Sequence, residues 1–134
     1  MKFALVEGRR REAQPKRRGE CPGCGAQVIA KCGPKRLWHW AHMSVSTCDH
    51  WWEPETEWHR AWKNEFPEER QEFRQLAPDG ELHIADVKTE SGDILEFQYS
   101  NISYNERASR ENFYERMEWV VSGLRLKRDL PTFQ

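Results

Sequence analysis

The sequence predicts an α+β protein in which a short metal-stabilised ribbon precedes a core of one helix, three strands, a second helix and a last strand. Three observations support this prediction. Cys21 and Cys24 flank a Pro-Gly turn of the kind that gathers thiolates around a metal ion. Residues 81–100 alternate polar and apolar side chains on both sides of a Gly-containing turn. Residues 54–66 and 104–117 carry large apolar side chains at helical spacing.

Length and composition fit one domain of ordinary size with a small appendage. The chain has 134 residues, and seven Trp and six Phe supply large side chains for a core although the hydrophobic fraction is 37%. No apolar run approaches the roughly 20 residues of a membrane span, and MKFALVEG lacks the apolar stretch of a signal peptide. We therefore expect a cytoplasmic protein without a membrane partner, whose four Cys are metal ligands or plain thiols.

Residues 1–19 are a basic N-terminal segment. Residues 1–45 carry ten Lys or Arg against three acids, and residues 46–134 carry eleven against nineteen, although the net charge is only −1. Such a basic run is either a solvated tail or an arm that contacts the phosphates of a polyanion. The second interpretation makes nucleic acid the partner, through Arg9, Arg10, Arg11, Lys16, Arg17 and Arg18.

Residues 20–50 are a zinc-ribbon-like segment. In CPGCG the turn allows the thiolates of Cys21 and Cys24 to converge at about 2.3 Å from one ion. Alternatively, these two Cys are the only paired thiols, and the histidines pack with neighbouring Trp side chains. A ribbon this small needs structural Zn²⁺ to stay folded. The candidates for the remaining ligands are His39, His42 and Cys48, with Cys32 and His50 as spares.

Residues 51–134 form the predicted core, which opens with a helix. The helix is expected to begin near Pro54 and to end before Pro67, because Pro is favoured in the first turn and breaks a helix interior. Three aromatic residues at four-residue spacing, starting with Trp58, predict a buried stripe.

A second, polar stripe of the same helix contains Glu55, His59 and Lys63. Residues four apart are neighbours on a helix, so this stripe is either a solvated ladder or a functional face. In the functional interpretation Glu55 faces the acidic site described next, and His59 lies behind it.

The central feature of the core is a hairpin in residues 81–100. A three-residue loop with Gly92 in the left-handed position places Asp86 directly opposite Glu96, whereas an even-numbered loop would put the two acids on opposite faces. Two carboxylates about 5 Å apart repel unless a cation lies between them. Mg²⁺ or Mn²⁺, which take oxygen ligands, meet that demand. The alternative is a pair of solvated acids on the outer face.

Three further elements complete the predicted core. A strand at residues 71–76 leads into the hairpin. A helix after Ser100 has Ser103 or Asn105 as its cap, and a buried strand at residues 118–123 ends in a Gly.

This order of elements, with its acidic residues, resembles the PD-(D/E)XK nuclease core of restriction-endonuclease-like proteins. In that resemblance Glu55 matches the Glu of the first helix, Asp86 the Asp at a strand end, and Glu96-Phe97-Gln98 the (D/E)-x-K pair. Residues 20–123 resemble more specifically the competence protein CoiA-like family, through CPGCG, HWAH, EPETEWHRAWK, HIADVKT, LEFQYS and WVVSG. That family combines a zinc-ribbon-like segment with this core and is associated with processing DNA taken up by cells.

The resemblance implies metal-dependent hydrolysis of phosphodiester bonds, in DNA in preference to RNA. Asp86, Glu96 and the carbonyl of Phe97 would hold one or two Mg²⁺ ions. Gln98 would position the attacking water. Glu55, oriented by His59, would hold a second metal or a bridging water. Cutting both strands often needs two copies of a one-site domain, so a homodimer is also open.

Gln98 is the main departure from the nuclease pattern, because most such enzymes have Lys there. Gln can orient a water but brings no positive charge, which Lys63 or Lys88 would have to supply. The departure favours an alternative function, a catalytically inactive zinc-containing protein that binds nucleic acid. A third option, a zinc-stabilised protein-interaction domain, leaves the facing acids unexplained.

Overall fold

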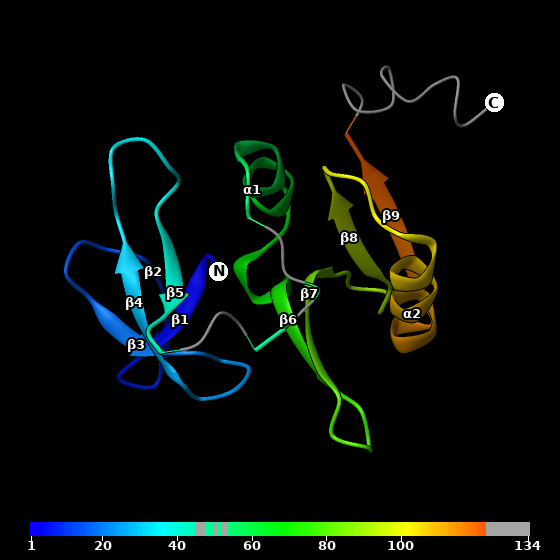
Figure 1. Cartoon of the computed structure of the whole chain (residues 1–134), viewed down its shortest axis with the longest axis horizontal. Helices are drawn as coiled ribbons and strands as arrows, with labels where there is room; N and C mark the ends of the chain where they lie inside the picture. The colour runs from blue at the N-terminus through cyan, green and yellow to red at the C-terminus, as the bar shows by residue number, and fades with distance from the viewer. Residues whose placement is uncertain (45–47, 50, 52–53, 123–134) are drawn as a thin grey trace. The chain divides into compact units, whose positions relative to one another are not determined.

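The computed structural model describes residues 1–44, 48–49, 51 and 54–122. The chain divides into two units, the first comprising Met1–Glu55 with Arg74–Ile84 and the second Thr56–Phe73 with Ala85–Gln134. Each unit contains most of one β-sheet (Figure 1). The predicted α+β class is therefore confirmed, and no helix in the described part of the chain is long and apolar enough to cross a membrane.

The sheet of the first unit has five antiparallel strands in the order β2-β1-β3-β4-β5 (Figure 1). Its core is a cluster of Ala4, Ala13, Cys21, Val28 and Trp40, all of them buried. The strands are β1 (Phe3–Val6), β2 (Arg9–Glu12), β3 (Arg18–Glu20), β4 (Gln27–Lys31) and β5 (His39–His42).

The basic N-terminal segment is part of this sheet, so its interpretation as a tail is wrong, whereas its contact with phosphates stays a prediction. β1 and β2 form a hairpin in which Val6 pairs with Arg9. Its two central residues, Glu7 and Gly8, both have positive φ, which matches the twist that a two-residue hairpin loop requires. The guanidinium of Arg10 lies 4.3 Å from the centre of the buried Phe3 ring, so this cation also packs against the core.

The second sheet has four strands in the order β6-β7-β8-β9 (Figure 1). β7 and β8 are antiparallel, whereas β8 and β9 are parallel and are joined through α2. The predicted order of helix, three strands, helix and strand is confirmed. Its elements are α1 (Glu57–Lys63), the 3₁₀-helix η1 (Glu68–Arg70), β6 (Gln71–Leu76), β7 (Leu82–Lys88), β8 (Ile94–Gln98), α2 (Tyr104–Tyr114) and β9 (Met117–Val121).

Helix α1 is shorter than predicted because Thr56 starts it. The Thr56 hydroxyl accepts the backbone N–H of His59, and the His59 ring accepts the backbone N–H of Thr56, which is a reciprocal capping box. The predicted buried aromatic stripe is confirmed only in part: Trp58 and Trp62 both contact the ring of the buried Phe97, but Trp62 is itself 38% exposed. The polar stripe is not a solvated ladder, because Lys63 is buried and pairs with Glu72 at 2.9 Å.

The C-terminal half of the core follows the prediction with one correction. Ser103 caps α2 by accepting the backbone N–H of Glu106. The helix ends at Glu115, whose positive φ of 63° breaks the helical path. The last strand was predicted to be buried, but β9 is an edge strand and its Val121 is exposed.

Candidate functional site

The CPGCG turn builds half of a metal centre in the first unit. The backbone N–H of Cys21 donates to Ala26, that of Gly25 donates to Cys21, and Gly25 has the positive φ that this turn needs. Gly23 donates its N–H to the Cys21 sulfur at 3.3 Å. A Cβ on Gly23 would lie 3.1 Å from the Ile84 side chain, which is tighter than an ordinary contact, so Ile84 would have to shift slightly to admit any other residue there.

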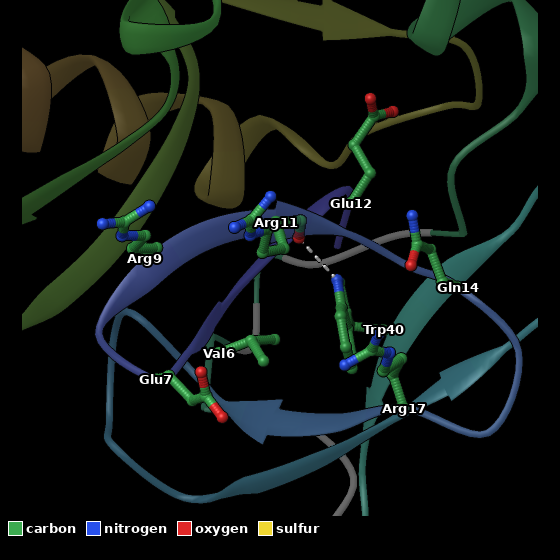
Figure 2. A pocket seen from close by; sticks show the side chains of 8 residues that line it. All are labelled: Val6, Glu7, Arg9, Arg11, Glu12, Gln14, Arg17 and Trp40. Carbon is green, nitrogen blue, oxygen red and sulfur yellow. Dashed lines mark hydrogen bonds between the residues drawn. The ribbon is translucent and has the colours of Figure 1, made fainter.

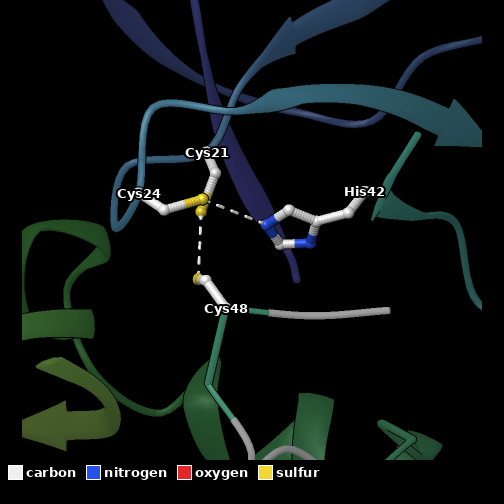
Figure 3. Close-up of side chains that lie close together, drawn as sticks. All are labelled: Cys21, Cys24, His42 and Cys48. Atoms are coloured by element: carbon white, nitrogen blue, oxygen red, sulfur yellow. Dashed lines mark hydrogen bonds between the residues drawn. The ribbon is translucent and has the colours of Figure 1, made fainter. Parts of the chain in front are cut away.

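Four ligand atoms converge at this turn (Figure 3). The sulfur atoms of Cys21 and Cys48 lie 3.6 Å apart, and the Cys24 sulfur lies 3.5 Å from Nε2 of His42. All four atoms lie within 4.8 Å of one another. A tetrahedral zinc ion with ordinary bond lengths would separate two sulfurs by about 3.8 Å and a sulfur from a nitrogen by about 3.6 Å. The cluster can therefore hold a metal such as zinc.

The pKa values of the cluster describe its chemistry without the ion. Burial, followed by the charges of Cys21 and Cys24, raises the pKa of Cys48 to about 12. For Cys24 burial acts in the same direction, but hydrogen bonds with Ala26, Cys21 and Cys48 outweigh it and lower the pKa. Burial and the N-terminal charge lower the pKa of His42, which favours the neutral, metal-binding imidazole. A bound divalent cation would stabilise the thiolates and so allow more than one of these thiols to ionise.

His39, predicted as the partner of His42, is not part of the cluster. Residues three apart in a strand point to opposite faces, so β5 can present only one of the two to the ion. Nδ1 of His39 is instead hydrogen bonded to the carbonyl of Leu37 at 2.8 Å. The spare candidate Cys32 packs against the core cluster of the first unit, and His50 lies outside the described residues.

Asp49 and His83 are polar partners that the sequence reasoning missed. Asp49 follows the ligand Cys48 and accepts the backbone N–H of Ile84 on β7 at 3.0 Å. Its other oxygen lies 2.7 Å from Nδ1 of His83, a fully buried side chain stacked on Trp51. The segment that carries the ligand Cys48 is thus hydrogen bonded to β7 through Asp49. An acid directly after a candidate Cys ligand was the only local signal for this contact.

In the second unit, Asp86 and Glu96 lie opposite each other on β7 and β8. The ladder pairs Val87 with Leu95 and Lys88 with Ile94, and the same register continued by one residue pairs the two acids. The loop has the predicted length, since Thr89 N–H donates to Asp93 at 2.8 Å and Gly92 has a φ of 94°. The geometry that the sequence predicted for this hairpin is confirmed.

The two carboxylates also serve as hydrogen-bond acceptors for the backbone. Glu96 Oε2 accepts the N–H of Asp86 at 3.0 Å, and Asp86 Oδ2 accepts the N–H of Phe97 at 2.8 Å. The other oxygen of Glu96 pairs with Arg110 of α2 at 3.2 Å, and both side chains are buried. Arg110 was not anticipated, although it shares the helix face of Tyr114, one turn away.

Gln98 lies on β8 two residues after Glu96 and is only 6% exposed. Its Nε2 donates to the carbonyl of Ser100 at 2.7 Å. Its Oε1 is buried and has no hydrogen-bond partner among the described residues. The side-chain amide is therefore held in one orientation, and its Oε1 can still accept a hydrogen bond.

The predicted roles of Glu55 and His59 stay predictions. Glu55 precedes the helix cap and is the last residue of the first unit's N-terminal segment, whereas Asp86 and Glu96 belong to the second unit. Nδ1 of His59 lies 2.9 Å from the Thr56 hydroxyl within the capping box. Among the described residues, the only group of three or more potential metal ligands is the Cys/His cluster.

The predicted phosphate contacts are divided between two faces of the first sheet. Arg9, Arg11 and Arg17 line a hollow of about 430 Å³, which Trp40 also lines (Figure 2). The indole N–H of Trp40 donates to the carbonyl of Arg11 at 2.9 Å and is thereby occupied. Glu7, Glu12, Val6 and Gln14 complete the lining. Arg10 lies outside this lining and packs on Phe3.

The comparisons with known proteins give one match. Residues 6–50 match the model of the competence protein CoiA N-terminal domain. No curated protein and no solved structure matches the chain. The matched segment contains the CPGCG turn and the His and Cys that complete the cluster, so sequence family and geometry point to the same region. Over residues 6–50, about a third of the chain, the protein is therefore similar to the N-terminal domain of competence protein CoiA.

Proposed function

We propose that this protein hydrolyses phosphodiester bonds in DNA in a reaction that depends on a divalent metal ion. The match of residues 6–50 to the CoiA N-terminal domain suggests a competence-related function. The observation that carries the proposal is the pairing of Asp86 with Glu96 across β7 and β8, with Gln98 on the same strand face as Glu96. The order of helices and strands around this pair supports a PD-(D/E)XK-like core, acting in a reducing cytoplasm.

The donors of this pair fit a magnesium-type ion. Mg²⁺ is usually bound through one or two carboxylates, keeps several waters and leaves room for substrate phosphate. A carboxylate has about four lone-pair sites, so each acid can bind a cation in addition to the N–H it already accepts. Asp86, Glu96 and the Phe97 carbonyl would hold the ion. When bound, it lowers the pKa of a water and neutralises charge on the phosphate.

Gln98 is suited to orient the attacking water. Its Nε2 is fixed by Ser100, and its buried Oε1 is an acceptor with no partner among the described residues. An unsatisfied buried acceptor costs folding free energy, and a catalytic role or a bound water is among the explanations for such groups in native proteins. A water held by Oε1 would have one proton directed away from the phosphate.

Arg110 supplies the positive charge that Gln98 lacks. It pairs with Glu96 at 3.2 Å and with Glu106 at 2.8 Å, and it is only 6% exposed. The sequence offered Lys63 and Lys88 as sources of this charge. In the structure Lys63 forms an ion pair with Glu72, and Lys88 lies over the Phe73 ring. We expect Arg110 to reduce the repulsion between Asp86 and Glu96 before a metal binds.

A second candidate function is binding of nucleic acid without hydrolysis. The observation that favours it is the same ion pair, because Arg110 occupies an oxygen of Glu96 that a metal would use. The hollow lined by Arg9, Arg11 and Arg17 would serve this function equally well. Cleavage and binding must therefore be measured separately.

A cleavage assay on plasmid and oligonucleotide DNA, with and without Mg²⁺ or Mn²⁺, tests the proposal. Asp86→Ala should abolish metal-dependent cleavage while DNA affinity stays within a few fold. Glu90→Gln is a matched control, because Glu90 is an exposed acid in the turn of the same hairpin. Continued cleavage by a clean preparation of Asp86→Ala would refute the assignment. Affinity without any cleavage by the wild-type protein would favour the second candidate.

A further inference from the structure

The hairpin formed by β4 and β5 carries an exposed Trp among cations. Between Glu20 and Asp49 the chain contains no acidic residue. The loop between the two strands contains Lys35 and Arg36, both exposed, and Trp38 is 46% exposed, whereas Trp40 and Trp51 of the same unit are buried. A single exposed ring is common on protein surfaces, but a ring surrounded by cations is the arrangement on which the bases of a polyanion can stack.

The ring of Trp38 is held in place. Its indole N–H donates to the carbonyl of Gly33 at 3.3 Å, which joins the two ends of the loop. The next residue, His39, is hydrogen bonded to Leu37, which fixes the turn from the other side. A side chain that is ordered before binding loses little conformational entropy when a ligand covers it.

The cations continue from the loop onto one face of the sheet. Lys31 is directly opposite His39, and Arg18 is directly opposite Ile29, which lies two residues before Lys31. Opposed residues and residues two apart share a face, so Arg18, Lys31 and His39 lie on one side. The nearest acid on that face of β3 is Glu20, beyond Arg18 and away from the loop. The hairpin patch consists of Arg18, Lys31, Lys35, Arg36 and Trp38.

We propose that the hairpin patch binds single-stranded nucleic acid, with a base stacked on Trp38 and phosphates contacted by the four cations. Aromatic platforms flanked by cations bind single strands because every unpaired base offers a face for stacking, whereas in a duplex neighbouring pairs cover those faces. The hollow of Figure 2 cannot act in this way, because Trp40 is only 2% exposed. The patch therefore selects strandedness and does not depend on hydrolysis.

Fluorescence anisotropy with labelled oligonucleotides tests this proposal. The host is the zinc-loaded full chain carrying Asp86→Asn, without added Mg²⁺, so binding is measured whether or not the wild type cleaves. The probes are oligo-dT and oligo-U of about 15 nucleotides, a typical site size for such platforms, and a duplex of the same length. Tighter binding of dT or of U identifies DNA or RNA as the preferred strand. The proposal is supported if oligo-dT, oligo-U or both bind more tightly than the duplex.

Substitution of Trp38 gives the decisive comparison. Trp38→Ala should weaken single-strand binding about tenfold, and Trp38→Phe, which keeps a ring, should stay within a few fold. Tyr104→Ala is the control, because Tyr104 is 84% exposed in the second unit and should have no effect. Zinc content and circular dichroism establish that each variant is folded. Unchanged affinity in folded Trp38→Ala, or equal losses for single strand and duplex, overturns the proposal.

The cations are tested by salt dependence. Lys35→Ala with Arg36→Ala should lower the slope of log K against log salt by about 1.4, or about 0.7 per phosphate contact in a single strand. Arg107→Ala with Arg116→Ala removes the same charge from exposed positions in the second unit and should leave the slope unchanged. Equal slopes for the two double variants would mean that only net charge matters and would refute the patch.

Discussion

Both units of this protein bring together side chains that can carry negative charge, but the two units keep that charge from building up in different ways. In the first, the Cys21 and Cys48 sulfurs lie 3.6 Å apart, and burial, followed by the effect of the neighbouring thiols, raises the pKa of Cys48 to about 12. In the second, Asp86 and Glu96 accept backbone N–H groups, and Arg110 balances Glu96. The Cys/His cluster needs a bound metal ion before its thiols can all ionise, whereas the carboxylate pair already has the guanidinium of Arg110 beside it.

From this difference we expect the first cluster to act as a structural metal centre and the second, if it binds metal, as an exchangeable one. Four protein ligands close a tetrahedral zinc site completely and leave no position for substrate. A carboxylate pair that is already satisfied by the protein can fold without metal and bind an ion together with phosphate. Removing the metal should therefore unfold the first unit, while the second unit should depend on its own ion pair.

The largest expected effect is loss of the structural metal. Cys24→Ser removes an exposed ligand without disturbing the core, and we expect loss of bound zinc and a fall of several kcal/mol in the free energy of unfolding, because structural zinc contributes roughly 10–16 kcal/mol in small domains. Metal analysis and thermal unfolding measure both effects. His39→Ala is the control and should retain one zinc per chain. Full zinc content in Cys24→Ser would show that the cluster is not a metal centre.

The next effect is the breaking of the ion pair in the second unit. Arg110→Ala leaves Glu96 buried without its counterion and should cost about 3–5 kcal/mol in urea unfolding. The double variant Glu96→Gln with Arg110→Met removes both charges and should recover most of that loss. Zinc content should stay at the wild-type level in both variants. A neutral effect of Arg110→Ala alone would mean that the pair does not stabilise the second unit.

Sequence reasoning succeeded where short-range chain geometry decides the outcome. A three-residue loop determines which residues face each other across β7 and β8, so the pairing of Asp86 with Glu96 could be derived from the position of Gly92. The CPGCG turn is local in the same sense, because its two Cys are three residues apart.

Sequence reasoning failed where partners come from distant segments or where a pattern is missing. His42 was not distinguished from His39 because the face of β5 that meets the other ligands depends on its pairing with β4. β2 gave no signal as a strand because Arg9–Glu12 is exposed at every position and does not alternate. Arg110 was assigned no role because its partner Glu96 is fourteen residues away on another element.

A change of pH should affect the first unit more strongly than the second. The raised pKa of Cys48 means that the thiol keeps its proton at neutral pH without metal, so ligation must release that proton. The lowered pKa of His42 means that the imidazole is already neutral there and releases none. Zinc affinity should therefore fall as pH falls from 8 to 7, by about tenfold for each thiol proton released. Competition with a chelating dye measures this slope, and a pH-independent affinity would contradict it.

The smallest change in stability, and the most informative one for function, is expected at Gln98. Gln71→Leu provides the matched control, because Gln71 is also a buried Gln of the second unit and donates to Phe66 at 2.8 Å. That substitution leaves the Phe66 carbonyl without its donor and should lower the free energy of unfolding by about 1–3 kcal/mol without affecting cleavage. Gln98→Leu removes an acceptor with no partner among the described residues. It also removes the donor to the Ser100 carbonyl, but Ser100 is exposed and water can replace that donor, so the unfolding free energy should stay within about 1 kcal/mol of wild type.

Cleavage by Gln98→Leu should nevertheless fall by about a hundredfold, the scale of a group that positions a reacting proton. Urea unfolding and the metal-dependent cleavage assay on the two Gln variants measure both quantities. A residue that contributes little to folding but strongly to turnover is retained for the reaction. If Gln98→Leu instead lost as much stability as Gln71→Leu and kept its activity, Gln98 would be a packing residue, and the carboxylate pair would have to orient the water unaided.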